Sequence, residues 1–278
     1  MRKNTKYHYQ NYTLVKNPQQ DFTRDPNINE PLKRKFDQVF NQLKGKKRTI
    51  RSTTGNLNVR SVIDFEISKR NDRVFDREIK SKGGTVILLV DGSGSMRYKD
   101  RMNHTRDLVA TLYKSLEGVN KVHFKVIMYL GSFYKKDQHL AVVEIDRLED
   151  CNKLVEDSID GFGSTPTASA MDYCTKLLNK IQGQKLVICI TDGQPALYDT
   201  TTRNYPVSES KSQQVDQATE AFLEGENNKI RPFGIGVNVG GEGMKKMFRR
   251  SFVEVQNIQQ IENLIAQRLS EFVKTLKI

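Results

Sequence analysis

The sequence predicts an α/β fold: a doubly wound, mostly parallel sheet with helices on both faces, one antiparallel edge strand and a basic N-terminal extension. From Thr85 onward, strand-like apolar runs alternate with segments whose apolar residues recur at helical spacing. This alternation is typical of crossover connections between parallel strands. The stretches HFKVIMYL and HLAVVEI are separated only by a short polar turn. This pair is therefore expected to be antiparallel, with the second strand at the edge.

The individual elements follow from the same patterns. Strands are expected at Val86–Val90, Val122–Leu130, Leu140–Ile145, Lys185–Thr191, Pro232–Val237 and Phe252–Val255. Helices are expected at Asn103–Leu116, Asp150–Ile159, Thr167–Ile181, Ser212–Gly225, Gly243–Arg249 and Ile258–Leu276.

The N-terminal part has a different character. Residues 1–30 are polar, contain Pro18 and Pro26, and are expected to form an extended or poorly ordered arm. In PLKRKFDQVFNQLKG the apolar residues have helical spacing, which predicts one helix from Pro31, whereas GNLNVRSVIDFEIS fits either a short helix or a strand. The predicted division is an extension over residues 1–83 and an α/β domain over residues 84–278.

Composition narrows the class of protein. No apolar run approaches the roughly 20 residues of a membrane helix, and the N-terminus lacks the apolar region of a secretory signal. Cys151, Cys174 and Cys189 are isolated, with no CxxC spacing, which favours reduced core residues over disulfides or a zinc site. We therefore expect a cytoplasmic protein.

Charge is concentrated in the N-terminal part. Residues 1–85 carry 20 Lys and Arg against 9 Asp and Glu, whereas residues 86–278 carry 25 against 24. A basic segment can bind nucleic acid or an acidic protein surface. No helix-turn-helix, zinc or RNA-recognition signature accompanies it, so a nucleic-acid-associated role for residues 33–60 is kept only as an alternative.

Polar residues gather where three segments should end at one edge of the sheet. TVILLVDGSGSM places Asp91, Ser93 and Ser95 after the first strand of the α/β domain, GSTPT places Thr165 before a helix, and ITDG places Asp192 after a core strand. The set offers carboxylate and hydroxyl oxygens but no nitrogen or sulfur, which suits a hard cation such as Mg²⁺, with Mn²⁺ or Ca²⁺ as alternatives. Ser164 is either a helix N-cap or an additional ligand.

These residues resemble the metal-ion-dependent adhesion site of von Willebrand factor A domains. The resemblance covers Gly84 to the C-terminus and implies that the serines and the threonine bind the ion, while the aspartates bind it directly or through water. It further implies that an open coordination position accepts a carboxylate from a partner protein. The implied function is therefore non-enzymatic, metal-dependent protein binding.

A finer resemblance concerns one group within that family. The stretches DREIKSKGGTVILLVDGSGSM, ITDGQPALYDTTTRNYPVSESKSQQVDQA and IRPFGIGVNVG are similar to the C-terminal domain of the cobaltochelatase von Willebrand A subunit. Related domains accompany magnesium chelatase and MoxR-type AAA+ ATPases. The implied partner is an AAA+ ATPase, with a subunit of a cobalt or magnesium chelatase as the alternative, and Asn204, Tyr205 and Pro206 would sit beside the ion.

No catalytic residue is expected. Aspartate-based phosphatases carry a second Asp two residues after the first, where this chain has Ser93. DGSGSM does not match the G-x-S-x-G nucleophile turn of hydrolases, and the glycine-rich stretches lack the lysine of a phosphate-binding loop.

Overall fold

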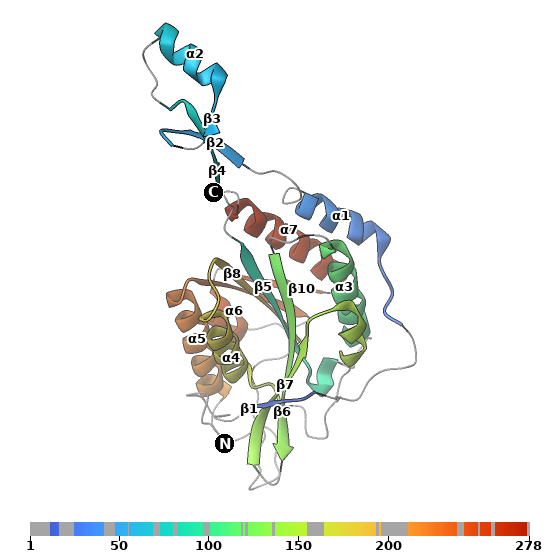
Figure 1. Ribbon diagram of the computed structural model, residues 1–278. Coiled ribbons are helices and arrows are strands. Elements are labelled where there is room, and N and C mark those ends of the chain that lie inside the picture. The colour runs from blue at the N-terminus through green and yellow to red at the C-terminus, as the bar shows by residue number, and fades with distance from the viewer. Residues whose placement is uncertain are drawn as a thin grey trace.

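A seven-stranded sheet forms the centre of this computed structural model, and helices cover both of its faces (Figure 1). All neighbouring strands are parallel except β6 and β7. Taken across the sheet, the strands are β1 (Tyr12–Leu14), β7 (Asp137–Ile145), β6 (Val122–Tyr134), β5 (Gly84–Asp91), β8 (Gln184–Thr191), β9 (Ile230–Val237) and β10 (Phe252–Val255). The predicted fold class is confirmed.

The structure describes the following residues: 12–16, 25–41, 48–54, 56–68, 73–79, 83–96, 101–117, 119, 122–134, 137–154, 164–192, 195, 211–237, 242–249, 251–256 and 259–276. Within them, no helix combines the length and the apolar character that crossing a membrane requires.

The side chains of β5 alternate between two hydrophobic clusters. Val86, Leu88 and Val90 face the cluster that includes α1 (Glu30–Asn41), α3 (Arg101–Leu116) and α7 (Gln259–Thr275). Ile87 and Leu89 face the cluster that includes α4 (Thr167–Leu178), α5 (Lys211–Asn227) and α6 (Glu242–Phe248). Because successive side chains of a strand point to opposite faces, a strand covered on both sides must be apolar throughout. This explains the uninterrupted run that follows Thr85.

The outer edge of the antiparallel pair differs from the prediction. β7 pairs antiparallel with β6 as expected, but it is not the edge strand, because β1 pairs with it in parallel through Leu140, Ala141 and Val142. Residues 12–16 were expected to belong to an extended or poorly ordered arm; Tyr12–Leu14 are extended, but as a strand of the sheet. All three side chains of β1 are exposed, so this strand has no apolar alternation that the sequence could reveal.

The remaining N-terminal elements form two groups. The predicted helix after Pro31 is confirmed as α1, and the Asn29 side chain accepts the Leu32 N–H at 3.1 Å at its first turn. The second group is an antiparallel sheet of β2 (Arg48–Ser52), β4 (Phe75–Ile79) and β3 (Asn56–Leu57), with α2 (Val59–Ser68) between β3 and β4. It projects from the main body (Figure 1). In the segment that fitted a helix or a strand, Val59–Ser68 form a helix and Asn56–Leu57 form the short strand β3.

One predicted helix is wrong in the part that the structure describes. Instead of a helix beginning at Asp150, the chain forms the short 3-10 helix η2 (Leu148–Lys153), which ends at Leu154. Residues 155–159 of the prediction lie outside the described residues. The Leu154 N–H donates to the Cys151 carbonyl at 3.0 Å, so the last turn has the three-residue spacing of a 3-10 helix.

Candidate metal centre

Two aspartates lie where the connections of the sheet reverse direction. The neighbours β5 and β8 are parallel and paired as far as Val90 and Ile190, while the chain continues from β5 to β6 on one side and from β8 to β9 on the other. Ligands of doubly wound sheets bind at such switch points, beyond the carboxyl ends of the strands. Asp91 is the last residue of β5, and Asp192 follows the last residue of β8.

Asp91 is completely buried and accepts two hydrogen bonds. One carboxylate oxygen accepts the Ser93 N–H at 2.9 Å, and the other accepts the Thr191 hydroxyl at 2.7 Å. Burial and the nearby charge of Asp192 raise the pKa of Asp91 from 3.8 to about 6, although both hydrogen bonds act in the opposite direction. An ionised Asp91 is therefore a buried anion that a cation would stabilise.

The two serines connect the aspartates. The Ser93 and Ser95 hydroxyl oxygens are 2.9 Å apart, and Ser95 donates to Asp192 Oδ1 at 2.7 Å. The turn that carries them packs tightly against β6, because a Cβ atom on Gly92 would lie 2.9 Å from Met128 Cγ. Four of the five predicted site residues thus form one hydrogen-bonded network.

Thr165 reaches the same end of the sheet by a different route. Ser164, next to it, pairs with Gly131 of β6, whose N–H donates to the Ser164 carbonyl at 2.9 Å. The Thr167 hydroxyl lies 3.2 Å from the Tyr129 hydroxyl of β6. Among the residues that the structure describes, no hydrogen bond joins the Thr165 hydroxyl to the other four.

Two further expectations concern the same loops. The N-cap of α4 is Pro166 and makes no side-chain cap, so the interpretation of Ser164 as the cap is wrong. Backbone pairing with Gly131 holds Ser164 two residues before the N-cap position. Asn204, Tyr205 and Pro206, expected beside the ion, lie outside the described residues.

Arg101 is a site residue that the sequence analysis missed. It is the first residue of α3, and its Nη1 donates to Asp192 Oδ2 in an ion pair. The Asp192 side chain is fully buried and that of Arg101 is 10% exposed. An arginine at a helix start normally lies in solvent, so its sequence position gave no signal. The only available hint was that two buried carboxylates require positive charge nearby.

The donor set fits a hard divalent cation. In the described part of the chain, no three His, Cys, Asp or Glu side chains come together in a way that could hold a metal. An ion at this edge would therefore be held by two carboxylates and by hydroxyl oxygens, the ligands of Mg²⁺ rather than of zinc or copper. The raised pKa of Asp91 supports this fit, because a cation between Asp91 and Asp192 would relieve their repulsion.

The three cysteines lie in the hydrophobic core. All three are buried and free. Burial raises the pKa of the Cys151 thiol to about 12 and that of Cys174 well above its usual range. They are core residues, as the sequence predicted.

Comparison with known proteins bears on the family and the fold. The family model described as von Willebrand factor type A domain matches residues 85–267. No curated protein sequence matches the chain.

Among solved structures, the pilus adhesin SpaC from Lactobacillus rhamnosus GG in its open conformation has a TM-score of 0.52 and 14% identity. The match covers 72% of this chain and 31% of SpaC. The vWF domain of the type V pili tip protein Mfa5 from Porphyromonas gingivalis has a TM-score of 0.50 and 11% identity, over 70% of this chain and 97% of that one. The PilB minor pilin from Streptococcus sanguinis has a TM-score of 0.50 and 14% identity. That match covers 72% of this chain and 64% of PilB. At these identities the likeness concerns the fold alone.

Proposed function

Because this chain belongs to the von Willebrand factor type A domain family, we propose that it is a non-enzymatic protein that binds a partner through a Mg²⁺ ion. The proposed ligands are Asp91, Ser93, Ser95, Thr165 and Asp192. The observation that carries the proposal is the network in which Ser95 bonds both Ser93 and Asp192 while Asp91 is held rigid by Ser93 and Thr191.

The charge of the site favours an acidic partner. When bound, the ion supplies a coordination position for a carboxylate oxygen of the partner. The hydroxyl ligands are neutral, so two ionised aspartates just balance a divalent cation. Arg101 then leaves one net positive charge at this end of the sheet. Such a surface attracts Asp or Glu side chains.

The partner class is proposed from the sequence resemblance alone. Similarity to the cobaltochelatase von Willebrand A subunit and to domains that accompany MoxR-type proteins supports an AAA+ ATPase as the partner. A subunit role in a cobalt or magnesium chelatase is the alternative within that resemblance. The pilus proteins share the fold with this chain. At 11–14% identity this likeness does not support a pilus role for it. The basic charge of residues 1–85 supports a second alternative, nucleic-acid association through residues 33–60.

The test joins ion binding and partner capture. Isothermal titration with Mg²⁺ should give saturable binding to the wild type and to Asp216→Ala, a control at an exposed aspartate on α5. Ser95→Ala and Asp192→Ala should lose it. The same four proteins would then be immobilised, exposed to lysate of the source cell with Mg²⁺ or EDTA, and the captured proteins identified by mass spectrometry.

An AAA+ ATPase retained only by the wild type and the control, and only in Mg²⁺, would support both the ion and the partner class. Co-capture of a large porphyrin-binding subunit would favour the chelatase alternative. Capture that persists in EDTA and in Asp192→Ala would refute the metal bridge. Binding of nucleic acid that weakens steeply with salt would instead assign the function to the basic segment.

A further inference from the structure

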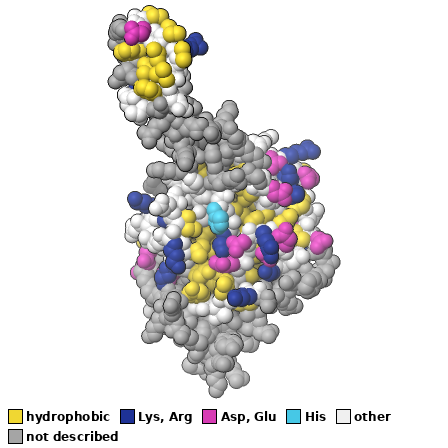
Figure 2. Space-filling view, viewed as in Figure 1, with side chains coloured by type: hydrophobic (Ala, Val, Ile, Leu, Met, Phe, Trp, Pro, Cys, Tyr) yellow, Lys and Arg dark blue, Asp and Glu magenta, His cyan; other side chains and the backbone are white. Residues whose placement is uncertain are grey.

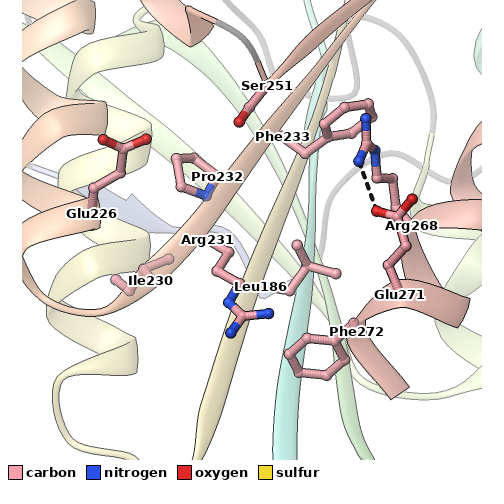
Figure 3. Close-up of a pocket in the computed structure, with 10 residues that line it drawn as sticks. All are labelled: Leu186, Glu226, Ile230, Arg231, Pro232, Phe233, Ser251, Arg268, Glu271 and Phe272. Atoms are coloured by element: carbon pink, nitrogen blue, oxygen red, sulfur yellow. Dashed lines mark hydrogen bonds and ion pairs between the residues drawn. The ribbon is translucent and has the colours of Figure 1, made fainter. Parts of the chain in front are cut away.

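A cavity of about 290 Å³ lies at the opposite end of the sheet from the candidate metal centre (Figure 3). β10 begins beside the middle of β9, because Phe252 pairs with Gly234. Among the described residues, the first four residues of β9 therefore have no strand partner on that side. Pro232 lies in this unpaired stretch. A proline suits an edge position because it has no N–H to leave unsatisfied.

One part of the cavity wall is apolar. Leu186 and Phe233 point from β8 and β9 toward α7, and Phe272 closes the cavity from α7 (Figure 3). All three side chains are at least 95% buried. The cavity therefore offers two aromatic rings and a branched aliphatic side chain to an apolar group of about the size of one amino-acid side chain.

Two arginines line the same space, together with Glu226 and Glu271, so the formal charges of the lining balance. The Arg268 guanidinium stacks on the Phe233 ring at 4.1 Å and binds Glu271 through Nη1 at 2.7 Å. Its Nε is buried and has no hydrogen-bond acceptor within the part of the chain that the structure describes. The exposed Arg231 projects from β9 beside Leu186 (Figure 3). No ion pair of Arg231 is found among the described residues.

We propose that this cavity binds a carboxylate attached to an aromatic or branched aliphatic group, such as a small free acid or the C-terminal residue of a peptide. The planar guanidinium of Arg231 matches the geometry of a carboxylate, and the buried Nε of Arg268 is a second donor that gains an acceptor. The apolar part of the ligand lies between Phe233 and Phe272. The site needs no metal ion and is independent of the partner binding proposed above.

The test is an amide NMR titration of the whole chain in EDTA with four probes. N-acetylphenylalanine is the free acid, and the peptide acetyl-Gly-Gly-Gly-Phe carries the same group at a chain end. N-acetylphenylalanine amide lacks the carboxylate, and acetate lacks the ring. We expect at least one of the first two to shift the Leu186, Phe233 and Phe272 amides with a dissociation constant of about 1 mM, the range for ligands of this size. The tighter of the two identifies the source of the carboxylate.

Variants assign the binding to the two guanidinium groups. Arg231→Gln should weaken binding of the acid about tenfold, as expected for a charge-assisted hydrogen bond, and Arg268→Gln should also weaken it. Arg60→Gln, on the projecting α2, is the matched control and should bind like the wild type. Because Arg231 is exposed, its variant should keep the wild-type spectrum around Asp192, which verifies folding.

Three results would overturn the proposal. One is the absence of saturable shifts with both acids. Another is equal affinity for N-acetylphenylalanine and its neutral amide. The third is unchanged affinity in Arg231→Gln. Loss of Mg²⁺ binding in Asp192→Ala would leave all of these measurements unaffected, so failure of either proposal can be recognised separately.

Discussion

Asp91→Asn should make the metal-free protein more stable at neutral pH and at the same time abolish its stabilisation by Mg²⁺. Asparagine has the shape of aspartate but no charge, so it removes a buried anion without leaving a cavity. Its carbonyl oxygen can still accept the Ser93 N–H, and its amide can donate to the Thr191 hydroxyl. A substitution that only damaged packing would lower stability in every condition.

The magnitude follows from the pKa of Asp91. A change from 3.8 to about 6 on folding corresponds to about 3 kcal/mol at 1.36 kcal/mol per pKa unit. Because this carboxyl has the higher pKa in the folded state, the unfolded chain ionises first. The stability that a neutral Asp91 side chain gives the folded state is complete below about pH 4 and is lost as the pH rises through about 6. The advantage of Asp91→Asn should therefore grow from near zero at about pH 4 to about 3 kcal/mol at about pH 7.5.

Urea unfolding in EDTA at these two pH values measures the effect. Asp216→Asn, at an exposed aspartate paired with Lys246, is the control and should change the unfolding free energy little at either pH. Repeating the neutral series with Mg²⁺ should raise the midpoint of the wild type and of the control only. Equal destabilisation of Asp91→Asn at both pH values, or a preserved Mg²⁺ response, would refute the reasoning.

Three other predictions concern Arg101, Gly234 and the cysteines. Arg101→Gln should lower the unfolding free energy in EDTA by about 3 kcal/mol, because it leaves the buried Asp192 carboxylate without its cation; urea unfolding would check this, and Mg²⁺ should restore part of the loss. Gly234→Ala should cost about 2 kcal/mol in the same assay, since its Cβ atom would lie 2.4 Å from a Phe248 ring carbon, and a wild-type midpoint would contradict this. Iodoacetamide at about pH 8 should leave Cys151, Cys174 and Cys189 unmodified until guanidinium unfolds the chain, because burial suppresses the thiolates; mass spectrometry counts the modified sites.

The central part of the fold could be predicted because its constraints are local in the sequence. A strand buried on both faces must be an apolar run, as in β5 and β8, and each helix reveals its buried side by spacing. The grouping of Asp91 and Asp192 also followed, since parallel strands place their carboxyl ends at one edge. For these two aspartates the sequence predicted their place at the edge of the sheet but not the side chains that they contact.

The features that were missed depend on tertiary contacts. β1 is held by pairing with β7 and by the Tyr12 ring against Tyr173 at 4.9 Å, although its side chains remain exposed. Arg101 is buried by its neighbours and not by any property of its own segment. The apolar side of α2 is the reverse case, since its pattern was visible but its exposure was not. Val59, Ile63 and Ile67 have helical spacing and are nevertheless exposed. Figure 2 shows hydrophobic side chains on the surface of the projecting part. Their spacing predicts a helix without revealing whether a partner covers it.

The docking of the N-terminal elements sets an order of events during synthesis. β1 and α1 are translated before the elements they contact, since β1 pairs with residues 140–142. α1 and the residue before it bond to the start of α7, where Lys35 donates to Asn263 at 2.7 Å and Asn29 donates to Glu262 at 3.3 Å. These contacts join residues more than 200 positions apart, and such contacts form late. α1 can first dock on α3, where the Asn29 N–H donates to the Thr111 hydroxyl at 3.1 Å, whereas β1 stays accessible to nascent-chain binders until β7 has emerged.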